Sequence, residues 1–302
     1  MKPMSPLVTI ITPTFNQAEF IVDTVESVLN QTYQYIEYLV IDDGSTDQTS
    51  KLMSAYDQRL RYIQQDNVGQ AATLNRGWHL STGQIIGYLS SDDCLKPTAV
   101  EELVKALLDS SETVLVYPDF DLIDASGRVF RLVQTEEFSF DRLQVDLVCQ
   151  PGPGALFKKV VFDEIGGWNE GLRQVPDFEY WLRASQTGKF KRVAKSLAYY
   201  RVHEDSGAFR PVSIDRSNEI IEVIRSHWNA SQKNQQKKQN ALSNAHLIAA
   251  KSHLQSGRLR MGVANWIRAL KFQPCKVFSI STWRLILSGL LRRHIHRIFR
   301  NS

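Results

Sequence analysis

The sequence predicts an α/β protein with a mostly parallel sheet flanked by helices, a small antiparallel element and a C-terminal helical extension. Three observations lead to this prediction. Apolar, β-branched runs alternate with helical patterns over residues 7–110, as in βαβ units. After residue 113 two strands flank a turn, which indicates an antiparallel hairpin. From about residue 214 onward the pattern is helical throughout.

The elements of the first part follow one another at regular spacing. Strands are expected over residues 7–12, 36–41, 61–65 and 84–90. Helices are expected over residues 20–29, where apolar side chains recur at spacings of three and four, and over residues 69–80. A further helix is expected over residues 97–110, with Pro97 in its first turn.

The second part is less regular. The stretch at 113–133 contains the turn "DASGR" between its two strands, and "PGPGALFKK" reads as a loop that leads into the next element. An amphipathic helix with an acidic start is expected over residues 176–189, and a strand over residues 196–203. The helical part is interrupted by a polar linker at residues 231–240.

Charge is distributed unevenly along the 302 residues. Residues 223–302 hold 15 of the 36 Lys and Arg residues and none of the 32 Asp and Glu residues, so residues 1–222 carry a net charge of −11. This contrast predicts that the two parts meet different electrostatic partners.

The sequence lacks the features that are typical of secreted or membrane-spanning chains. Cys94, Cys149 and Cys275 are odd in number and widely spaced, which fits a reducing compartment better than a disulfide framework. The first residues lack the apolar core of a signal peptide, and no uncharged apolar run reaches the roughly 18–20 residues that span a bilayer. A cytoplasmic protein is therefore expected.

Polar groups gather at the predicted carboxyl ends of three strands. The first strand leads into "TPTFNQAE", the second into "DDGSTD" and the fourth into "SSDD". Ligands of open parallel sheets bind at this edge. Neither the glycine fingerprint of dinucleotide-binding folds nor a P-loop follows the first strand, so a divalent metal held by carboxylates is the natural means of neutralising phosphates.

Each of these motifs alone is weak. Two aspartates after a strand are more often a turn and a helix cap than a metal site. The combination of both acidic motifs on neighbouring strands, behind "PTFN", is what favours a site.

The ordered motifs resemble those of family 2 glycosyltransferases. They are "VTIITPTFNQAEFIVDTVESVLNQTYQYIEYLVIDDGSTDQT", "DNVGQAATLNRGW", "STGQIIGYLSSDDCLKP", "GGWNEGLRQVPDFEYWLR" and "YYRVHED", and together they cover roughly residues 7–206. The resemblance implies the GT-A fold and transfer of a sugar from a nucleotide-sugar with inversion at the anomeric carbon.

The resemblance also implies a role for each matching residue. The positions that match the nucleotide-binding residues of the family are Pro13, Phe15, Glu19, Asp43, Asn67, Gly69, Asn75 and Asp92. Asp93 matches the metal ligand, His203 matches a position beside the metal and the diphosphate, and Asp177 matches the catalytic base. The implied cofactor is Mg²⁺ or Mn²⁺.

One position departs from the family pattern. Many relatives carry an acid where this chain has Ser90, so the motif reads Ser90-Ser91-Asp92-Asp93. Two carboxylates remain, and diphosphate oxygens and water can complete an octahedral shell. Asp93 is expected to contribute more to metal binding than Asp92.

The chemistry of sugar transfer is consistent with this assignment. A divalent cation stabilises the charge that develops on the leaving diphosphate. The acceptor hydroxyl needs a base, and Asp177 at a helix start is kept ionised by the helix dipole, although a carboxylate there is also an ordinary helix cap. Glu179 is the alternative base.

The C-terminal segment predicts contact with a membrane surface. Residues 276–300 mix apolar and aromatic side chains with six cations and no acid, which suits a helix in the interface of an anionic membrane. Packing on the acidic first part of the chain remains the alternative. No motif that reads nucleic acid accompanies these cations.

The predicted organisation is a GT-A domain over residues 1–222 and a basic, all-helical extension over residues 223–302. Within the domain, residues 1–100 are expected to bind the nucleotide and residues 101–222 to hold the acceptor and the base. The predicted reaction is metal-dependent inverting transfer from a UDP- or dTDP-linked sugar to a hydroxyl of a cell-surface glycan or a lipid-linked acceptor, at the inner face of the plasma membrane.

Two other functions are retained as alternatives. A sugar-1-phosphate nucleotidyltransferase shares the nucleotide-binding topology, but it needs a Gly-rich, basic loop after the first strand, and "TPTFNQAE" has none. A nucleotide-sugar-binding protein without turnover is the other alternative, and the presence of both Asp93 and Asp177 argues against it.

Overall fold

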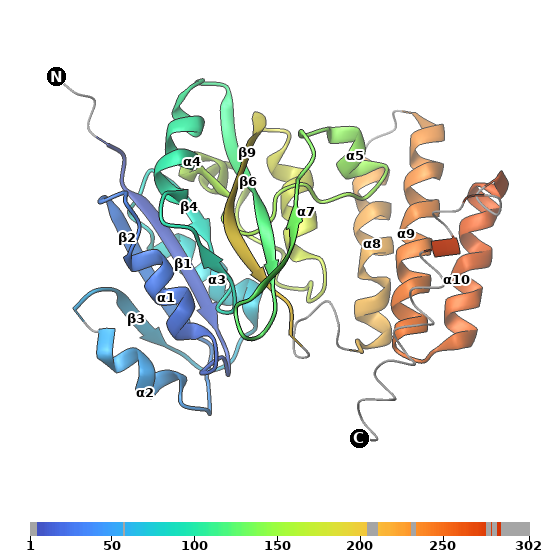
Figure 1. Cartoon of the computed structure of the whole chain (residues 1–302). Helices are drawn as coiled ribbons and strands as arrows, with labels where there is room; N and C mark the ends of the chain where they lie inside the picture. Colours follow the sequence, from blue (N-terminus) through green and yellow to red (C-terminus); the bar gives the residue numbers. More distant parts are fainter. Residues whose placement is uncertain are drawn as a thin grey trace. The chain divides into compact units, whose positions relative to one another are not determined.

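The computed structural model describes residues 5–56, 58–203, 211–230 and 234–275, together with Ser279, Trp283 and Arg284. The chain divides into two compact units (Figure 1). The sheet unit comprises residues 1–138 and 149–203, and the helical unit comprises residues 139–148 and 204–302.

The sheet unit is organised around nine strands in the order β3-β2-β1-β4-β8-β6-β9-β5, with β7 paired to β6 outside this path. The strands are β1 (Val8–Thr14), β2 (Ile36–Asp42), β3 (Arg61–Gln64), β4 (Ile85–Tyr88), β5 (Cys94–Leu95), β6 (Thr113–Ile123), β7 (Val129–Val133), β8 (Leu156–Lys158) and β9 (Lys189–Arg201). Strands β1 to β4 pair parallel with one another, and β6 pairs parallel with β9, whereas β8 pairs antiparallel with β4 and β6, β7 with β6, and β5 with β9. The predicted α/β class with a mostly parallel sheet is confirmed.

Helices cover both faces of this sheet. They are α1 (Ile21–Leu29), α2 (Thr49–Met53), α3 (Gln70–Leu80), α4 (Ala99–Leu108), α6 (Lys159–Ile165) and α7 (Pro176–Ala184). On one face the apolar sides of α1 and α4 meet the sheet, and Val8 and Ile10 of β1 join Val25 and Leu103 in the main core.

Aromatic side chains fill the other face. Trp78 of α3 is fully buried, with its ring centroid 5.5 Å from that of Phe157 of β8 and 5.3 Å from that of Tyr180 of α7. The alternation of side chains along each strand therefore supplies two cores, one to each helical layer.

The helical unit contains α5 (Phe140–Gln144), α8 (Ile214–Ala230), α9 (Gln235–Gln255) and α10 (Leu259–Phe272). Helix α9 packs against both α8 and α10. Residues 139–148 belong here because Trp228 Nε1 donates to the carbonyl oxygen of Gln144 and Asn244 Nδ2 donates to that of Val145, at 3.3 and 2.8 Å. The unit boundary thus differs from the expected division at residues 222 and 223, which falls inside α8.

Two element boundaries also differ from the predictions. The expected linker at residues 231–240 is shorter, because Asn234 caps α9 by accepting a hydrogen bond from the backbone N–H of Lys237, and the following Gln and Lys residues favour helix. The strand expected from residue 196 begins at Lys189, where its parallel pairing with β6 starts.

Within the described part of the chain, no helix combines the length and apolar character that crossing a bilayer requires.

Helix α3 approaches β1 so closely that the contact requires glycine. A Cβ atom on Gly77 would lie 2.6 Å from Cγ2 of Ile11 and 3.1 Å from Cδ1 of Ile41. The side chains of Ile11 and Ile41 are both buried. We predict that Gly77→Ala lowers the free energy of unfolding by about 1–3 kcal/mol, because overpacking outweighs the better helix propensity of alanine. Urea unfolding measures this, with Gly171→Ala at an exposed turn as the control, and equal stability of the two variants would contradict the prediction.

Candidate active site

A cavity of about 230 Å³ opens in the sheet unit at the carboxyl end of β4. It is lined by Gln70, Tyr88, Ser90, Asp93, Pro151, Gly152, Pro153, Trp168, Arg173, Gln174, Pro176, Asp177 and Tyr200. The predicted metal ligand and the predicted base therefore share one cavity, although 84 residues and several elements separate them in the chain.

Asp93 is held at the end of β4 by the surrounding backbone. Its N–H donates to the carbonyl oxygen of Ser90 at 3.1 Å, and its own carbonyl oxygen accepts a hydrogen bond from Thr24 Oγ1 at 2.8 Å. Burial raises the pKa of Asp93 well above its ordinary value, and the charge of Asp92 raises it further. The N–H and the charge of Arg201 act in the opposite direction, so the ionised carboxylate is only partly compensated.

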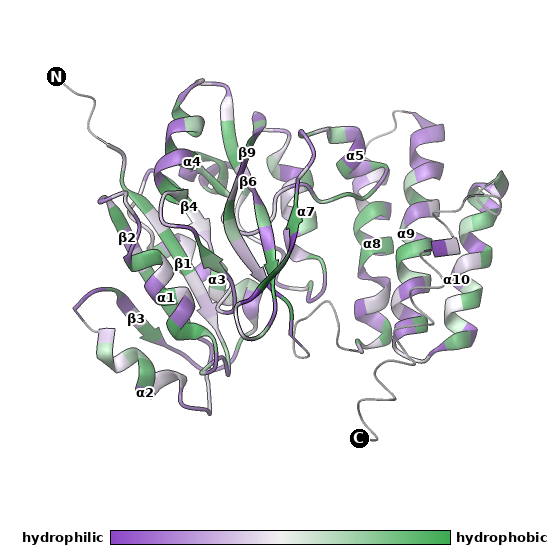
Figure 2. Ribbon diagram, in the orientation of Figure 1, coloured by the Kyte–Doolittle hydropathy of each residue, from purple (hydrophilic) through white to green (hydrophobic). Residues whose placement is uncertain are grey.

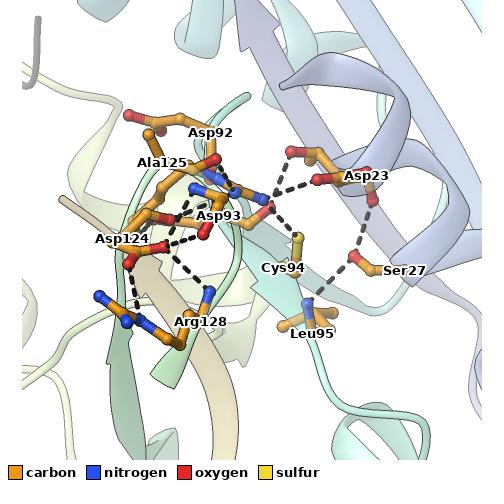
Figure 3. Close-up of polar contacts among 12 residues, drawn as sticks. Asp23, Ser27, Asp92, Asp93, Cys94, Leu95, Asp124, Ala125 and Arg128 are labelled. Atoms are coloured by element: carbon orange, nitrogen blue, oxygen red, sulfur yellow. Dashed lines mark hydrogen bonds and ion pairs between the residues drawn. The ribbon is translucent and has the colours of Figure 1, made fainter. Parts of the chain in front are cut away.

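Arg201, at the end of β9, connects this motif to two other segments, the β6–β7 turn and α1. Its backbone N–H donates to Asp93 Oδ1, and its side-chain Nε donates to the carbonyl oxygen of Asp92, both at 2.9 Å. Nη1 donates to the carbonyl oxygen of Ala125 at 3.0 Å, and Nη2 donates to Asp23 Oδ2 of α1 at 2.9 Å. Figure 3 shows that Asp92 and Asp93, Asp23 of α1, and Asp124 and Ala125 of the β6–β7 turn lie close together.

The sequence-based prediction missed Arg201. Its side chain is only 2% exposed, and its cation also lies over the ring of Phe20, with 4.9 Å between Cζ and the centroid. The signal was present in "YYRVHED", where an arginine ends a strand two residues before the predicted His203. What the sequence does not show is that β9 ends beside the loop that follows β4.

His203 lies against Asp92. The Nε2 atom of the imidazole is 3.1 Å from Asp92 Oδ2, and the ring packs on that of Phe20 with 4.6 Å between centroids. The structure thus places His203 beside Asp92, and its predicted position beside the metal and the diphosphate stays a prediction.

Asp177 occupies the first turn of α7 and faces the cavity. Burial raises its pKa, while the N–H groups of Phe178 and of Asp177 itself lower it. The charge of Asp177 in turn raises the pKa of Tyr88, which is already raised by burial. A carboxylate with a raised pKa in a partly desolvated cavity has the properties of a general base.

Glu179 has a different partner. Its two carboxylate oxygens accept hydrogen bonds from Nε and Nη2 of Arg183 at 2.7 and 2.8 Å, and Nη1 and Nη2 of Arg183 also donate to the carbonyl oxygens of Ile165 and Gly167. This bidentate pair fixes α7 to the preceding loop. Glu179 is therefore a structural residue rather than an alternative base.

Asp43, at the carboxyl end of β2, organises the loop that carries two other predicted residues. Its Oδ1 accepts hydrogen bonds from Gln65 Nε2 and from the N–H of Val68, and its Oδ2 accepts one from the N–H of Gly69, all at 2.8–2.9 Å. Gly69 has a φ of +93°, and a Cβ atom there would lie 1.5 Å from Nη1 of Arg173. The loop thus needs glycine for its backbone conformation, and the guanidinium of Arg173 occupies the space that a Cβ atom would take.

Asn75 is separated from this group. Its amide binds the turn before α7: Nδ2 donates to the carbonyl oxygen of Trp168 and to Glu170 Oε1, and Oδ1 accepts from the N–H of Trp168, all at 2.8–2.9 Å. A Cβ atom on Gly167 would lie 2.1 Å from Asn75 Oδ1, which explains the second glycine of "GGW". Asn75 acts on the cavity through the position of Trp168.

Three of the remaining predicted residues lie at or just after the carboxyl end of β1, and the fourth, Asn67, lies in the loop after β3. Pro13 is buried and pairs with Ile41 of β2, Phe15 is 46% exposed, and Glu19 and Asn67 are exposed. None of these four lines the cavity that contains Asp93 and Asp177. The predicted residues thus form a rim at β1 and β2 and a cavity at β4 and α7.

The acidic motif offers few protein ligands for a metal. Among the described residues, no group of three or more His, Cys, Asp and Glu side chains is placed to hold an ion. Two adjacent carboxylates, one of them buried with a raised pKa, nevertheless suit a divalent cation that takes its remaining oxygens from a bound ligand and water.

Comparison with known proteins places these features in a family. Residues 9–166, just over half of the chain, match the family model described as glycosyl transferase family 2. The chain is 30% identical over 240 residues to an uncharacterized glycosyltransferase of Rickettsia felis, and 32% identical over 226 residues to a chondroitin synthase of Escherichia coli. These alignments cover 75% and 73% of this chain but only 39% and 32% of those proteins, so the chain spans well under half the length of these curated relatives.

Solved structures show the same fold at low identity. S. aureus TarS 1–349 in complex with UDP-GlcNAc superposes with a TM-score of 0.69 at 16% identity, covering 96% of this chain and 91% of that one. The mannosyltransferase PcManGT of Pyrobaculum calidifontis, in complex with GDP-Man and Mn²⁺, superposes with a TM-score of 0.60 at 16% identity, covering 98% and 88%. The predicted GT-A fold is confirmed by these neighbours.

We predict that Arg201→Met lowers the free energy of unfolding by about 2–3 kcal/mol, because the carbonyl oxygens of Asp92 and Ala125 lose their partly buried hydrogen bonds and the buried site of the guanidinium loses its donors. The matched control is Arg128→Met on the same β6–β7 turn, whose side chain is 81% exposed and pairs with Asp124. That change should cost less than about 1 kcal/mol. Urea unfolding of both variants tests the prediction, which fails if they are equally stable.

Proposed function

The chain belongs to glycosyl transferase family 2, and from this premise we propose that it transfers a sugar, with inversion, from a nucleotide-sugar to a hydroxyl group. The proposed donor is UDP- or dTDP-linked, and the proposed acceptor is a growing cell-surface glycan or a lipid-linked sugar. In support, relatives of this chain are named chondroitin synthase and hyaluronan synthase, and two proteins of similar fold were solved with UDP-GlcNAc and with GDP-Man.

The observation that carries the proposal is the shared cavity of Asp93 and Asp177. Burial of two carboxylates at one cavity raises the free energy of the chain unless a cation, a proton or a ligand compensates it. A transferase of this class needs one carboxylate to bind the cation that neutralises the leaving group, and a second carboxylate, on a separate element, to accept the proton of the acceptor hydroxyl. Asp93 and Asp177 are the two carboxylates that we propose for these tasks.

Asp92 and Asp93 are the proposed ligands of Mg²⁺ or Mn²⁺, and His203 supports them through its contact with Asp92. When bound, the ion would neutralise charge on the departing diphosphate. The side chain of Arg201 donates a hydrogen bond to the carbonyl oxygen of Asp92 rather than to a carboxylate oxygen, and its backbone N–H donates one to Oδ1 of Asp93. The chain thereby fixes the loop while the other carboxylate oxygen of Asp93 remains available.

Asp177 is the proposed base. It would accept the proton of the acceptor hydroxyl as that oxygen attacks the anomeric carbon from the face opposite the leaving group. Tyr88, Trp168 and Tyr200 line the same cavity and supply the apolar and aromatic surface on which a sugar ring packs. Arg173, the arginine among the lining residues, is placed to meet negative charge on the donor.

The nucleotide is proposed to lie on the rim formed by the carboxyl ends of β1 and β2. Pro13 lies near the end of β1, Phe15 and Glu19 follow this strand, and Asp43 holds the loop that carries Asn67 and Gly69. Asn75 enters the proposal as the residue that holds Trp168 at the cavity.

The proposal extends to location. Residues 276–300 are proposed to contact the anionic inner face of the plasma membrane, which would bring a lipid-linked acceptor to the enzyme. Apart from Ser279, Trp283 and Arg284, this segment lies outside the described residues. The proposed halves of the transferase domain are residues 1–100 for the nucleotide and residues 101–222 for the acceptor.

A first prediction concerns the metal. Thermal unfolding with a panel of nucleotide-sugars should show stabilisation by the cognate donor in the presence of Mn²⁺ and much less without it, since a ligand at about 100 times its Kd stabilises by about 2.7 kcal/mol. Asp93→Ala should abolish the Mn²⁺-dependent part, and Asp92→Ala should weaken it. Asp124→Ala, on the neighbouring β6–β7 turn, is the control and should retain it. Equal stabilisation of wild type and Asp93→Ala would remove Asp93 from this role.

A second prediction concerns the base. Asp177→Asn should lower turnover by about 10²–10⁴-fold while donor binding is retained, because the acceptor hydroxyl loses its proton acceptor. Glu179→Gln should keep most of the turnover. Initial rates with the donor identified by thermal unfolding measure both, and unchanged turnover of Asp177→Asn would exclude Asp177.

The pH dependence follows from the raised pKa of Asp177. The base acts in its ionised form, so turnover should rise with pH through that pKa, at a higher pH than for an ordinary aspartate. The acid limb should be absent from the residual activity of Asp177→Asn. An acid limb that persists unchanged in the variant would assign it to another group.

A further inference from the structure

Helix α10 of the helical unit carries an apolar stripe that no described residue covers. Leu259, Val263 and Ile267 are spaced four residues apart, so they follow one side of the helix, and each is between 45% and 48% exposed. With Arg260 and Ala264 they line a shallow cavity of about 430 Å³. Figure 2 shows hydrophobic and hydrophilic segments alternating along this helix.

The stripe is separate from the side of α10 that packs on α9. That side is formed by Gly262, Asn265 and Ala269, which are buried. Gly262 allows a close approach, since a Cβ atom there would lie 2.6 Å from Cγ of Leu254. Packing within the unit therefore accounts for one side of α10 and leaves the apolar stripe without a structural role.

Cations flank the stripe on one side. At 100° per residue, Arg260, Lys271 and Arg268 follow the stripe around the helix, and all three are exposed. Residues 223–302 contain no Asp or Glu, so no acidic neighbour on α8, α9 or α10 beyond residue 222 reduces this charge. The exposed surface of α10 thus combines an apolar stripe with a positive flank.

We propose that α10 binds the surface of an anionic lipid bilayer, with Leu259, Val263 and Ile267 in the interface and Arg260, Arg268 and Lys271 at the lipid headgroups. An apolar stripe beside a cationic flank is what an interfacial helix requires. A second copy of the chain would place like charges opposite one another across a two-fold axis. The cations could also bind the phosphates of a nucleic acid, but such a partner would leave the aliphatic stripe exposed to water.

This inference deepens the proposed membrane contact but rests on other residues than the segment at 276–300. Two contacts of moderate strength on one chain would act together, because binding of one raises the local concentration of membrane at the other. The structure thus assigns a first, folded contact to α10, to which the C-terminal segment adds.

Flotation with lipid vesicles tests the proposal on the full chain. Vesicles of phosphatidylcholine with phosphatidylglycerol should retain the protein at low salt, and vesicles of phosphatidylcholine alone should not. The double variant Val263→Ser with Ile267→Ser should lower the vesicle partition coefficient at least tenfold. The double variant Arg260→Gln with Lys271→Gln should lower it as well, by about fivefold for each cation.

A matched control comes from β7 of the sheet unit. Phe130 and Leu132 are exposed to a similar degree as the stripe, so Phe130→Ser with Leu132→Ser removes as much exposed apolar surface elsewhere. This control should bind vesicles as the wild type does. If it loses binding as strongly as the stripe variant, the effect is general hydrophobicity and the proposal is overturned.

Other outcomes separate the two membrane contacts. If Arg292→Gln with Arg293→Gln abolishes binding while the α10 variants bind normally, the contact at 276–300 stands and the one at α10 is overturned. The proposal is also overturned if the stripe variant binds vesicles normally but has a different oligomeric state, because a second copy of the chain then covers the stripe. It is equally overturned if that variant binds vesicles normally but is less stable, with an unfolding equilibrium constant raised several-fold, because the chain's own C-terminal segment then covers the stripe.

Discussion

The buried guanidinium of Arg201 is the interaction on which the arrangement of the site depends. It ends β9 and meets the loop after β4, the start of α1 and the β6–β7 turn at one point. Three of its contacts are with backbone carbonyl or side-chain oxygens that are far apart in the chain, so each of these segments gains a fixed position only when β9 is in place. A planar group with five donors suits this task, whereas a lysine in its place offers a single donor centre.

The same arrangement explains how the chain tolerates Asp92 and Asp93 side by side. Arg201 places a positive charge next to them without occupying the second carboxylate oxygen of Asp93, and His203 and Phe20 close the other side. The compensation is incomplete, as the raised pKa of Asp93 indicates. A fully neutralised pair would have no affinity left for a cation, so the incomplete compensation is what makes the site suitable for a ligand that brings one.

Sequence patterns predicted the parts of the fold that local chemistry determines. The strands β1 to β4 and the helices between them follow from apolar periodicity, and the acidic motifs fall at strand ends because polar side chains terminate buried runs. Asp93 and Asp177 could be named from motifs, but their shared cavity depends on α7 packing against α3 through Trp78 and Tyr180. The roles of Arg201 and Asn75 depend on partners that lie 76 to 178 residues away, and a single sequence contains no signal for such pairings. The pair of Glu179 with Arg183, four residues apart on one helix, is by contrast a local pairing that helical spacing indicates.

The uneven distribution of charge along the chain corresponds to different surroundings of the charged side chains in the two units. In the sheet unit, carboxylates lie at strand ends and at a helix start, where backbone N–H groups, including that of Arg201, stabilise them, and two of these carboxylates line one cavity. On α10 no acidic residue accompanies the cations, so the charge of the exposed Arg260, Arg268 and Lys271 is directed outward. Self-repulsion of this kind raises the free energy of the folded unit unless an external anion reduces it. A surface that is both cationic and apolar is relieved most by a partner that supplies anions and an apolar phase together, and a lipid bilayer is such a partner.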